Sequence, residues 1–247
     1  MGNSTTVCLH GVLTELPNHQ LPSNYLPDFY MSEDAFSWNL FNQAPIVGII
    51  RHVIPENVSR ILPIYQEAGL TTVEITMNTP GAETMIQDAL RKYPVSLNIG
   101  AGTVCSEADL ERALAAGAQF IVAPIINKKV IKACVKKGIP IFPGAFTPSE
   151  IYKAWDLGAS MVKVFPTTAL GPAYIRDIKA PLNQIKLLPT GGITLTNMRD
   201  FMKAGADGLG IGSQLFDTRL IAEQDWPALK AHFQAFIDQL PTNRPKN

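Results

Sequence analysis

The 247-residue sequence predicts a single parallel (β/α)8 barrel, also called a TIM barrel, and two observations lead to this fold class. First, a glycine recurs between the end of a predicted helix and an apolar strand, where a left-handed residue is favoured. These glycines are Gly69, Gly117, Gly138, Gly158 and Gly205. Second, their gaps are 48, 21, 20 and 47 residues, so each long gap is twice a short one to within a few residues. Each long gap therefore predicts one further unit that lacks the glycine.

Apolar runs at a spacing of about 20–24 residues are the predicted strands of these units. They cover residues 46–51, 72–77, 97–101, 119–123, 140–143, 161–165, 186–189 and 208–211. Helical spacing between them is clearest at 55–68, 106–116, 194–204 and 226–237. An open doubly wound sheet is the alternative. It usually has fewer strands, and the glycine-rich dinucleotide turn is missing after the first strand, where the chain reads RHVIP at 51–55.

The barrel is expected to occupy residues 45–240, between an N-terminal extension at 1–44 and a tail at 241–247. Prolines interrupt the polar extension. The stretch SEDAFSWNLF at 32–41 predicts a short amphipathic helix near 33–41 that begins with a serine cap and covers the N-terminal end of the barrel. A segment without regular structure is the alternative.

Composition and charge exclude several classes of function. Lys+Arg and Asp+Glu number 21 each, so nothing indicates a nucleic-acid or membrane surface. No apolar run approaches the roughly 18–20 residues that span a bilayer, and the N-terminal residues lack the basic-then-apolar pattern expected of a signal peptide. The odd, scattered cysteines predict free thiols in the cytoplasm, and the histidines lack metal-ligand spacing. These residues are Cys8, Cys105, Cys134, His10, His19, His52 and His232.

Two charged residues lie inside predicted strands, Glu74 in VEIT and Lys163 in VKVF. If both side chains point into the barrel, burial lowers the pKa of the lysine and raises that of the carboxylate. Such a lysine forms Schiff bases with carbonyl compounds, and such a carboxylate transfers protons near neutral pH. A buried ion pair without catalytic function, or outward-pointing side chains, would explain the same residues. Their joint position at strand ends favours catalysis.

Other candidate site residues also lie where predicted strands end, which is the catalytic face of this fold. They are Arg51, Asn78, Thr103, Pro124, Phe142, Phe165 and Thr190. Glycine-rich turns follow the seventh and eighth strands, in PTGGITLT (189–196) and GLGIGSQL (208–215). Their N–H groups, with a helix end after strand eight, predict a phosphate site at Gly191, Gly192, Gly212 and Ser213. The alternative is that the glycines only permit tight turns.

Four motifs in register resemble one enzyme family. VEITMNT (73–79), IGAGTV (99–104), KVFP (163–166) and PTGGI (189–193) are similar to the 2-keto-3-deoxy-6-phosphogluconate and 4-hydroxy-2-oxoglutarate aldolases. The resemblance covers about residues 45–240 and implies a class I aldolase without metal or cofactor that assembles as a homotrimer.

The resemblance also implies roles for individual residues. Lys163 would form the imine with the 2-keto carbon, and Glu74 would be the general acid and base. Thr103 and Arg51 would hold the pyruvate carboxylate, and Phe165 would border the pocket. The phosphate would bind at the two glycine-rich turns, and the products would be pyruvate and glyceraldehyde 3-phosphate.

Two features bear on the substrate. Asn78 stands where many phosphogluconate-type members carry Arg, whereas Arg51 and TTALGPAYIRDIK (167–179) resemble the 6-phosphogalactonate branch. Thr190 resembles the gluconate type, and a placed hydroxyl separates C4 epimers. We therefore favour the gluconate substrate. Three alternatives stay open: the galactonate epimer, unphosphorylated 4-hydroxy-2-oxoglutarate, and a phosphosugar-binding barrel without catalysis. A metal-dependent aldolase would need a ligand cluster that the histidines do not supply.

Overall fold

A computed structural model describes residues 7–9, 12–14 and 35–241, and the chain divides into two units, Met1–Ser32 and Glu33–Asn247. In the first unit, β1 (Val7–Leu9) and β2 (Val12–Thr14) form an antiparallel pair in which Val7 is opposite Thr14. The sequence analysis predicted no strands in this segment. Each unit is described by itself.

The second unit contains only parallel strands among its described residues. They are β3 (Ile46–Ile50), β4 (Thr72–Thr76), β5 (Asn98–Gly102), β6 (Ile121–Val122), β7 (Ile141–Phe142), β8 (Gly144–Ala145), β9 (Val162–Val164), β10 (Leu187–Pro189) and β11 (Leu209–Ile211). Each predicted strand agrees with an observed one to within two residues, because the apolar runs were bounded by clear breaks.

The strands form two hydrogen-bonded sheets, ordered β11-β3-β4-β5-β6-β7 and β10-β9-β8. Pro143 separates β7 from β8, so the fifth predicted strand passes from one sheet into the other. Between β10 and β11, Thr190 and Gly210 form an isolated parallel bridge. The prediction of an α/β fold with a curled parallel sheet is confirmed.

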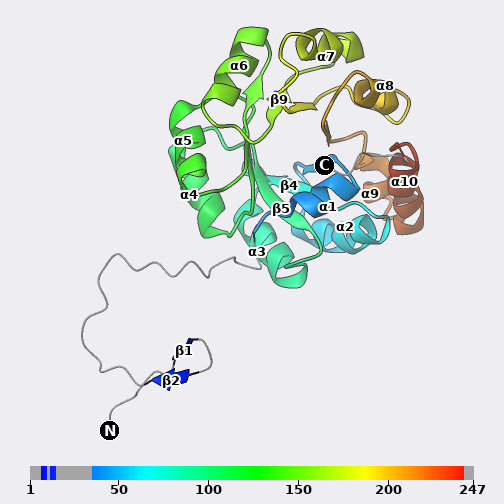
Figure 1. The fold of residues 1–247 in the computed structure, drawn as a ribbon. Coiled ribbons are helices and arrows are strands. Elements are labelled where there is room, and N and C mark those ends of the chain that lie inside the picture. The colour runs from blue at the N-terminus through cyan, green and yellow to red at the C-terminus, as the bar shows by residue number, and fades with distance from the viewer. Residues whose placement is uncertain (1–6, 10–11, 15–34, 242–247) are drawn as a thin grey trace. The chain divides into compact units, whose positions relative to one another are not determined.

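Helices alternate with the strands and lie around the outside of the curled sheet (Figure 1). They are α2 (Pro55–Glu67), α3 (Ala82–Lys92), α4 (Glu107–Ala115), α5 (Lys128–Lys136), α6 (Pro148–Asp156), α7 (Gly171–Lys179), α8 (Met198–Lys203), α9 (Thr218–Ala222) and α10 (Trp226–Asp238). The five glycines that follow predicted helices all have positive φ, between 68° and 101°. Only glycine adopts this conformation without cost, which explains why each helix ends there.

Helix α1 (Trp38–Gln43) precedes the first strand of this unit. It begins after Ser37, whose hydroxyl accepts a hydrogen bond from the Leu40 N–H at 3.2 Å, and not after Ser32 as predicted. Ser32 itself lies outside the described residues. The helix and Phe36, two residues before it, join an apolar cluster with strand side chains, comprising Phe36, Phe41, Val47, Phe120, Val122, Phe142, Met161 and Leu188. No helix of the described residues is long and apolar enough to cross a membrane.

Candidate active site

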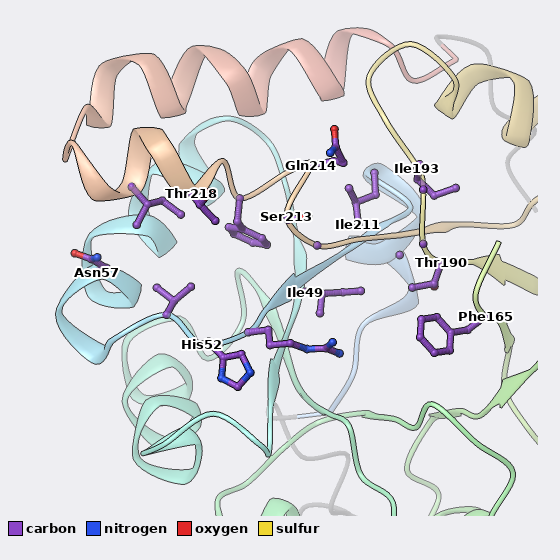
Figure 2. Close-up of a pocket in the computed structure, with 18 of the residues that line it drawn as sticks. Ile49, His52, Asn57, Phe165, Thr190, Ile193, Ile211, Ser213, Gln214 and Thr218 are labelled. Carbon is purple, nitrogen blue, oxygen red and sulfur yellow. The ribbon is translucent and has the colours of Figure 1, made fainter. Parts of the chain in front are cut away.

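A cavity of about 540 Å³ opens where several strands end, chiefly β3, β9, β10 and β11. Figure 2 shows Phe165, Thr190 and Ile193 on one side of this cavity and Asn57 and Thr218 on the other. Eight residues predicted for the site line it: Arg51, Lys163, Phe165, Thr190, Gly191, Gly192, Gly212 and Ser213. The rule that chemistry gathers at strand ends therefore located eight of the 21 residues that line the cavity.

Lys163 projects from the middle of β9, and only 3% of it is exposed. Its Nζ lies 5.3 Å from the centre of the Phe165 ring, and the side chain reaches the cavity. Burial lowers the pKa of Lys163; the charge of Glu74 opposes this change, and that of Arg51 adds to it. A lowered pKa supplies the neutral amine that attacks carbonyl carbon.

Glu74 lies at the centre of β4 and is completely buried. Neither carboxylate oxygen has a hydrogen-bond partner among the described residues, and Glu74 forms no ion pair with Lys163. Burial raises the pKa of Glu74, while the charges of Lys163 and Arg51 oppose the rise. A buried carboxylate without partners is costly for folding, so this side chain is better explained by proton transfer than by stability.

The space for Glu74 is provided by the neighbouring strand. In β5, a β-carbon at Gly102 would overlap the Glu74 carboxylate. Two residues earlier, a β-carbon at Gly100 would overlap the Phe120 ring. The two glycines of IGAGTV thus serve different layers of the interior: Gly100 admits an apolar ring, and Gly102 admits the carboxylate.

Arg51 and Thr103 meet above the ends of β3 and β5. The Arg51 guanidinium donates a hydrogen bond of 3.4 Å to the Thr103 hydroxyl. Thr103 has a φ of 57°, which is rare for a β-branched residue. Arg51 lines the cavity itself, whereas Thr103 reaches it only through Arg51. The pair can hold a carboxylate beside Lys163.

The two glycine-rich turns line the cavity at its other side. Gly191 and Gly192 both have positive φ, at 98° and 73°. The N–H groups of Gly192 and Ser213 have no hydrogen-bond acceptor among the described residues, so they are free to bind an anion. The helix after strand eight differs from expectation. Asp217 accepts hydrogen bonds from the first N–H groups of α9, so that helix end is already capped.

Some predicted residues are not brought into the cavity wall, among them Glu74, which is completely buried. Asn78 is exposed and does not line it, and neither does Pro124, whose carbonyl packs closely against Gly144. Phe142 joins the apolar cluster around α1 instead. The sequence analysis missed four polar lining residues, His52, Asn57, Gln214 and Thr218. His52 and Gln214 lie in the loops after β3 and β11, and Asn57 and Thr218 lie in the first turns of the helices that follow, α2 and α9. Searching a few residues past each strand would have found them.

The polar groups of the site are acidic and basic side chains together with backbone amides. No group of three or more His, Cys, Asp or Glu side chains that could hold a metal ion occurs in residues 7–9, 12–14 and 35–241. A desolvated lysine, an unpartnered carboxylate, a guanidinium and free N–H groups can bind a phosphorylated keto acid and form an imine with it.

Comparison with known proteins agrees with this geometry. The family model for "KDPG and KHG aldolase" matches residues 38–232. A 2-dehydro-3-deoxy-6-phosphogalactonate aldolase of Escherichia coli is 35% identical over 173 residues, 70% of this chain and 84% of the relative. A 2-dehydro-3-deoxy-phosphogluconate aldolase of Treponema pallidum is 34% identical over 167 residues, 66% of this chain and 79% of the relative.

A solved structure is also similar. It is the KDPG aldolase of Legionella pneumophila, with pyruvate captured at low pH as a covalent carbinolamine. It has a TM-score of 0.74 and 26% identity over 80% of this chain and 96% of its own. The family match covers well over half of the sequence, so the chain belongs to the KDPG and KHG aldolase family and is an aldolase, which makes it a lyase.

Proposed function

We propose that this protein is a class I aldolase that cleaves 2-keto-3-deoxy-6-phosphogluconate to pyruvate and glyceraldehyde 3-phosphate through an imine on Lys163. One observation carries the proposal: a buried lysine reaches the same cavity as two glycine-rich turns, with an unpartnered buried carboxylate coupled to it. The Legionella relative holds pyruvate as a carbinolamine, which is the first intermediate of such a reaction.

The cleavage begins when neutral Lys163 Nζ attacks the C2 carbonyl carbon and forms a carbinolamine. Protonated Glu74 gives a proton to the carbinolamine hydroxyl, which leaves as water, so that an iminium ion and the Glu74 carboxylate remain. Glu74 then removes the proton of the C4 hydroxyl. The C3–C4 bond breaks, its electron pair moves toward the iminium nitrogen, and the aldehyde leaves. Protonated Glu74 returns the proton to C3 of the resulting enamine. Water hydrolyses the iminium, releasing pyruvate and the neutral amine.

The substrate's two ends define its direction in the cavity. Arg51 and Thr103 hold the carboxylate next to C2, and Phe165 packs beside Lys163. Gly191, Gly192, Gly212 and Ser213 bind the 6-phosphate through their N–H groups, on turns that line the same cavity. Asn78 and Pro124, which follow β4 and β6, stay predicted pocket residues without a contact to support them.

The choice of C4 epimer depends on Thr190. This residue is buried, lines the cavity and donates its hydroxyl to the Leu188 carbonyl at 3.2 Å, so its oxygen can still accept a hydrogen bond from a substrate hydroxyl. The galactonate epimer is the second candidate. It is supported by Arg51 in the cavity wall and by a named galactonate relative at 35% identity.

Three further statements are proposals of the same kind. The strands close into an eight-stranded barrel, supported by the Thr190–Gly210 bridge between the two sheets. The protein assembles as a homotrimer, which sedimentation velocity would test. It acts in the cytoplasm, as its cysteine content predicts.

Imine trapping tests the reaction. The protein is incubated with pyruvate and borohydride, and the added mass is located by peptide mass spectrometry. We expect a reduced pyruvyl adduct on Lys163 that is absent in Lys163→Ala and present in Lys186→Ala, a change at an exposed lysine over Trp38. If no adduct formed while the phosphosugar still bound, the protein would be a non-catalytic phosphosugar-binding barrel and not an aldolase.

Steady-state kinetics identify the substrate. We expect a higher kcat/KM for the 6-phosphogluconate-derived keto acid than for its galactonate epimer and for 4-hydroxy-2-oxoglutarate. Thr190→Val should lower the ratio between the epimers by about tenfold, the effect of one lost hydrogen bond. A higher kcat/KM for the galactonate epimer in the wild-type protein would establish the second candidate.

A further inference from the structure

Residues that do not line the cavity form hydrogen bonds with the turn that contains Gly191 and Gly192. Thr167 follows β9, is 1% exposed, and makes two hydrogen bonds to this turn. Its N–H donates to the Thr190 carbonyl at 2.9 Å, and its hydroxyl donates to the Gly191 carbonyl at 2.7 Å. One buried residue thus binds two successive carbonyl groups of the turn.

The next carbonyl is bound by a second residue, Asn197. Its side-chain amide donates to the Gly192 carbonyl at 2.8 Å, and its Oδ1 accepts from the Thr194 N–H at 2.8 Å. Three consecutive carbonyl groups, at residues 190 to 192, therefore point toward Thr167 or Asn197.

The direction of the N–H groups follows from peptide geometry. The C=O and N–H of a planar trans peptide point in opposite directions, so each held carbonyl turns the N–H of the next residue away from its partner. The Gly191 N–H faces Gly210, with which Thr190 forms the bridge between the two sheets. The N–H groups of Gly192 and Ile193 remain, and both residues line the cavity, whereas Thr167 does not. Figure 2 shows Thr190 and Ile193 at this wall of the cavity.

Packing supports the same arrangement. A β-carbon at Gly192 would come within 2.8 Å of the Thr168 Cα, so the turn lies directly against the segment after β9. With φ values of 98° and 73°, the turn presents successive N–H groups in the manner of an anion-binding nest.

We infer that Thr167 and Asn197 are positioning residues that aim the N–H groups of Gly192 and Ile193 at the substrate phosphate. The inference rests on the proposed function, because it assigns the orientation of the phosphate site proposed there. Thr167 acts through the backbone of the turn and touches neither the substrate nor the reacting atoms. Its hydroxyl therefore sets the preference for a phosphorylated substrate without altering imine chemistry.

The test compares a matched pair of substrates, the 6-phosphorylated keto acid and its unphosphorylated counterpart, for the C4 epimer that the wild-type protein cleaves faster. In Thr167→Val, which keeps the side-chain shape, kcat/KM for the phosphorylated substrate should fall about tenfold or more through KM. The value for the unphosphorylated substrate and pyruvate trapping on Lys163 should not change. Thr167→Ser should restore the phosphate preference.

Two further variants complete the test. Thr168→Val changes an exposed neighbour whose hydroxyl has no hydrogen bond among the described residues, and it should behave as wild type. Asn197→Ala should also lower the phosphate preference, and it serves if Thr167→Val does not fold.

The outcomes separate the inference from the proposed function. An unchanged preference in Thr167→Val and Asn197→Ala, or an equal loss on both substrates that Ser does not restore, would overturn the inference. If the wild-type protein trapped pyruvate but showed no preference for the phosphorylated substrate, the proposed phosphate site would be wrong. The inference, which depends on that site, would then be wrong as well.

Discussion

Gly102 lies against the carboxylate of Glu74 so closely that a β-carbon would come within 2.6 Å of Glu74 Cδ. Glu74 and Gly102 belong to neighbouring strands, where Thr76 is paired with Gly102 and Glu74 with Gly100. The absence of a side chain at residue 102 therefore determines where the buried carboxylate can lie.

Gly102→Ala should displace Glu74 and lower kcat by about 100-fold, because small misplacements of a catalytic group cost this much. Gly100→Ala is the comparison, since its β-carbon would meet the Phe120 ring in the apolar layer instead. Both variants should unfold at lower temperature, but only Gly102→Ala should change the pH dependence of turnover. Identical pH profiles in both variants would disprove a role for Gly102 in placing Glu74.

The pKa of Lys163 should govern imine formation. Burial lowers this pKa, and the amine reacts only when neutral, so the rate of pyruvate trapping should rise with pH and reach half its maximum below 10.4, the value of free lysine. Arg51 also lowers the pKa, so Arg51→Met should move the midpoint upward. Rapid-quench borohydride trapping across pH measures both. A wild-type midpoint near 10.4 would contradict the lowered pKa.

Lys163 should destabilise the folded protein at neutral pH. Lys163→Met removes a buried amine without a hydrogen-bond partner among the described residues, and it should raise the free energy of unfolding at neutral pH by about 1–3 kcal/mol. The folded pKa lies below the unfolded one, so the unfolded chain binds more protons between the two values. The wild-type protein thus gains stability as pH rises through this window, and the advantage of the variant should shrink. Urea denaturation at several pH values measures it.

Arg51 should bind the carboxylate of pyruvate. Arg51→Ala should raise the pyruvate concentration for half-maximal trapping by about 10–100-fold, the effect of losing a charge-assisted hydrogen bond. Arg60→Ala is the matched control, because Arg60 is an exposed residue of α2 that does not line the cavity. Equal pyruvate requirements in the two variants would show that the carboxylate binds elsewhere.

Much of the fold could be predicted from the sequence, because the signals that determine its helices and strands are local. Apolar runs, helix caps and glycines with positive φ each depend on a few adjacent residues. The helix expected at 106–116 begins in this way: Ser106 caps it and accepts a hydrogen bond from the Asp109 N–H at 3.1 Å. The cap of α1 was misplaced: the prediction put it at Ser32, whereas Ser37, five residues later, is the observed cap. The segment at 7–14 offered no periodic pattern, so its strand pair was not predicted.

For the site, the sequence by itself determined which chemistry is present: a lysine and a glutamate inside strands, an arginine and threonines at strand ends, and glycine-rich turns. The tertiary structure alone decided how they meet. Gly102 makes room for Glu74, Thr103 contacts Arg51 across 52 residues, and Thr167 binds the Gly191 carbonyl across 24. These relationships join residues that only strand pairing brings together, and no local pattern records which side chains become neighbours.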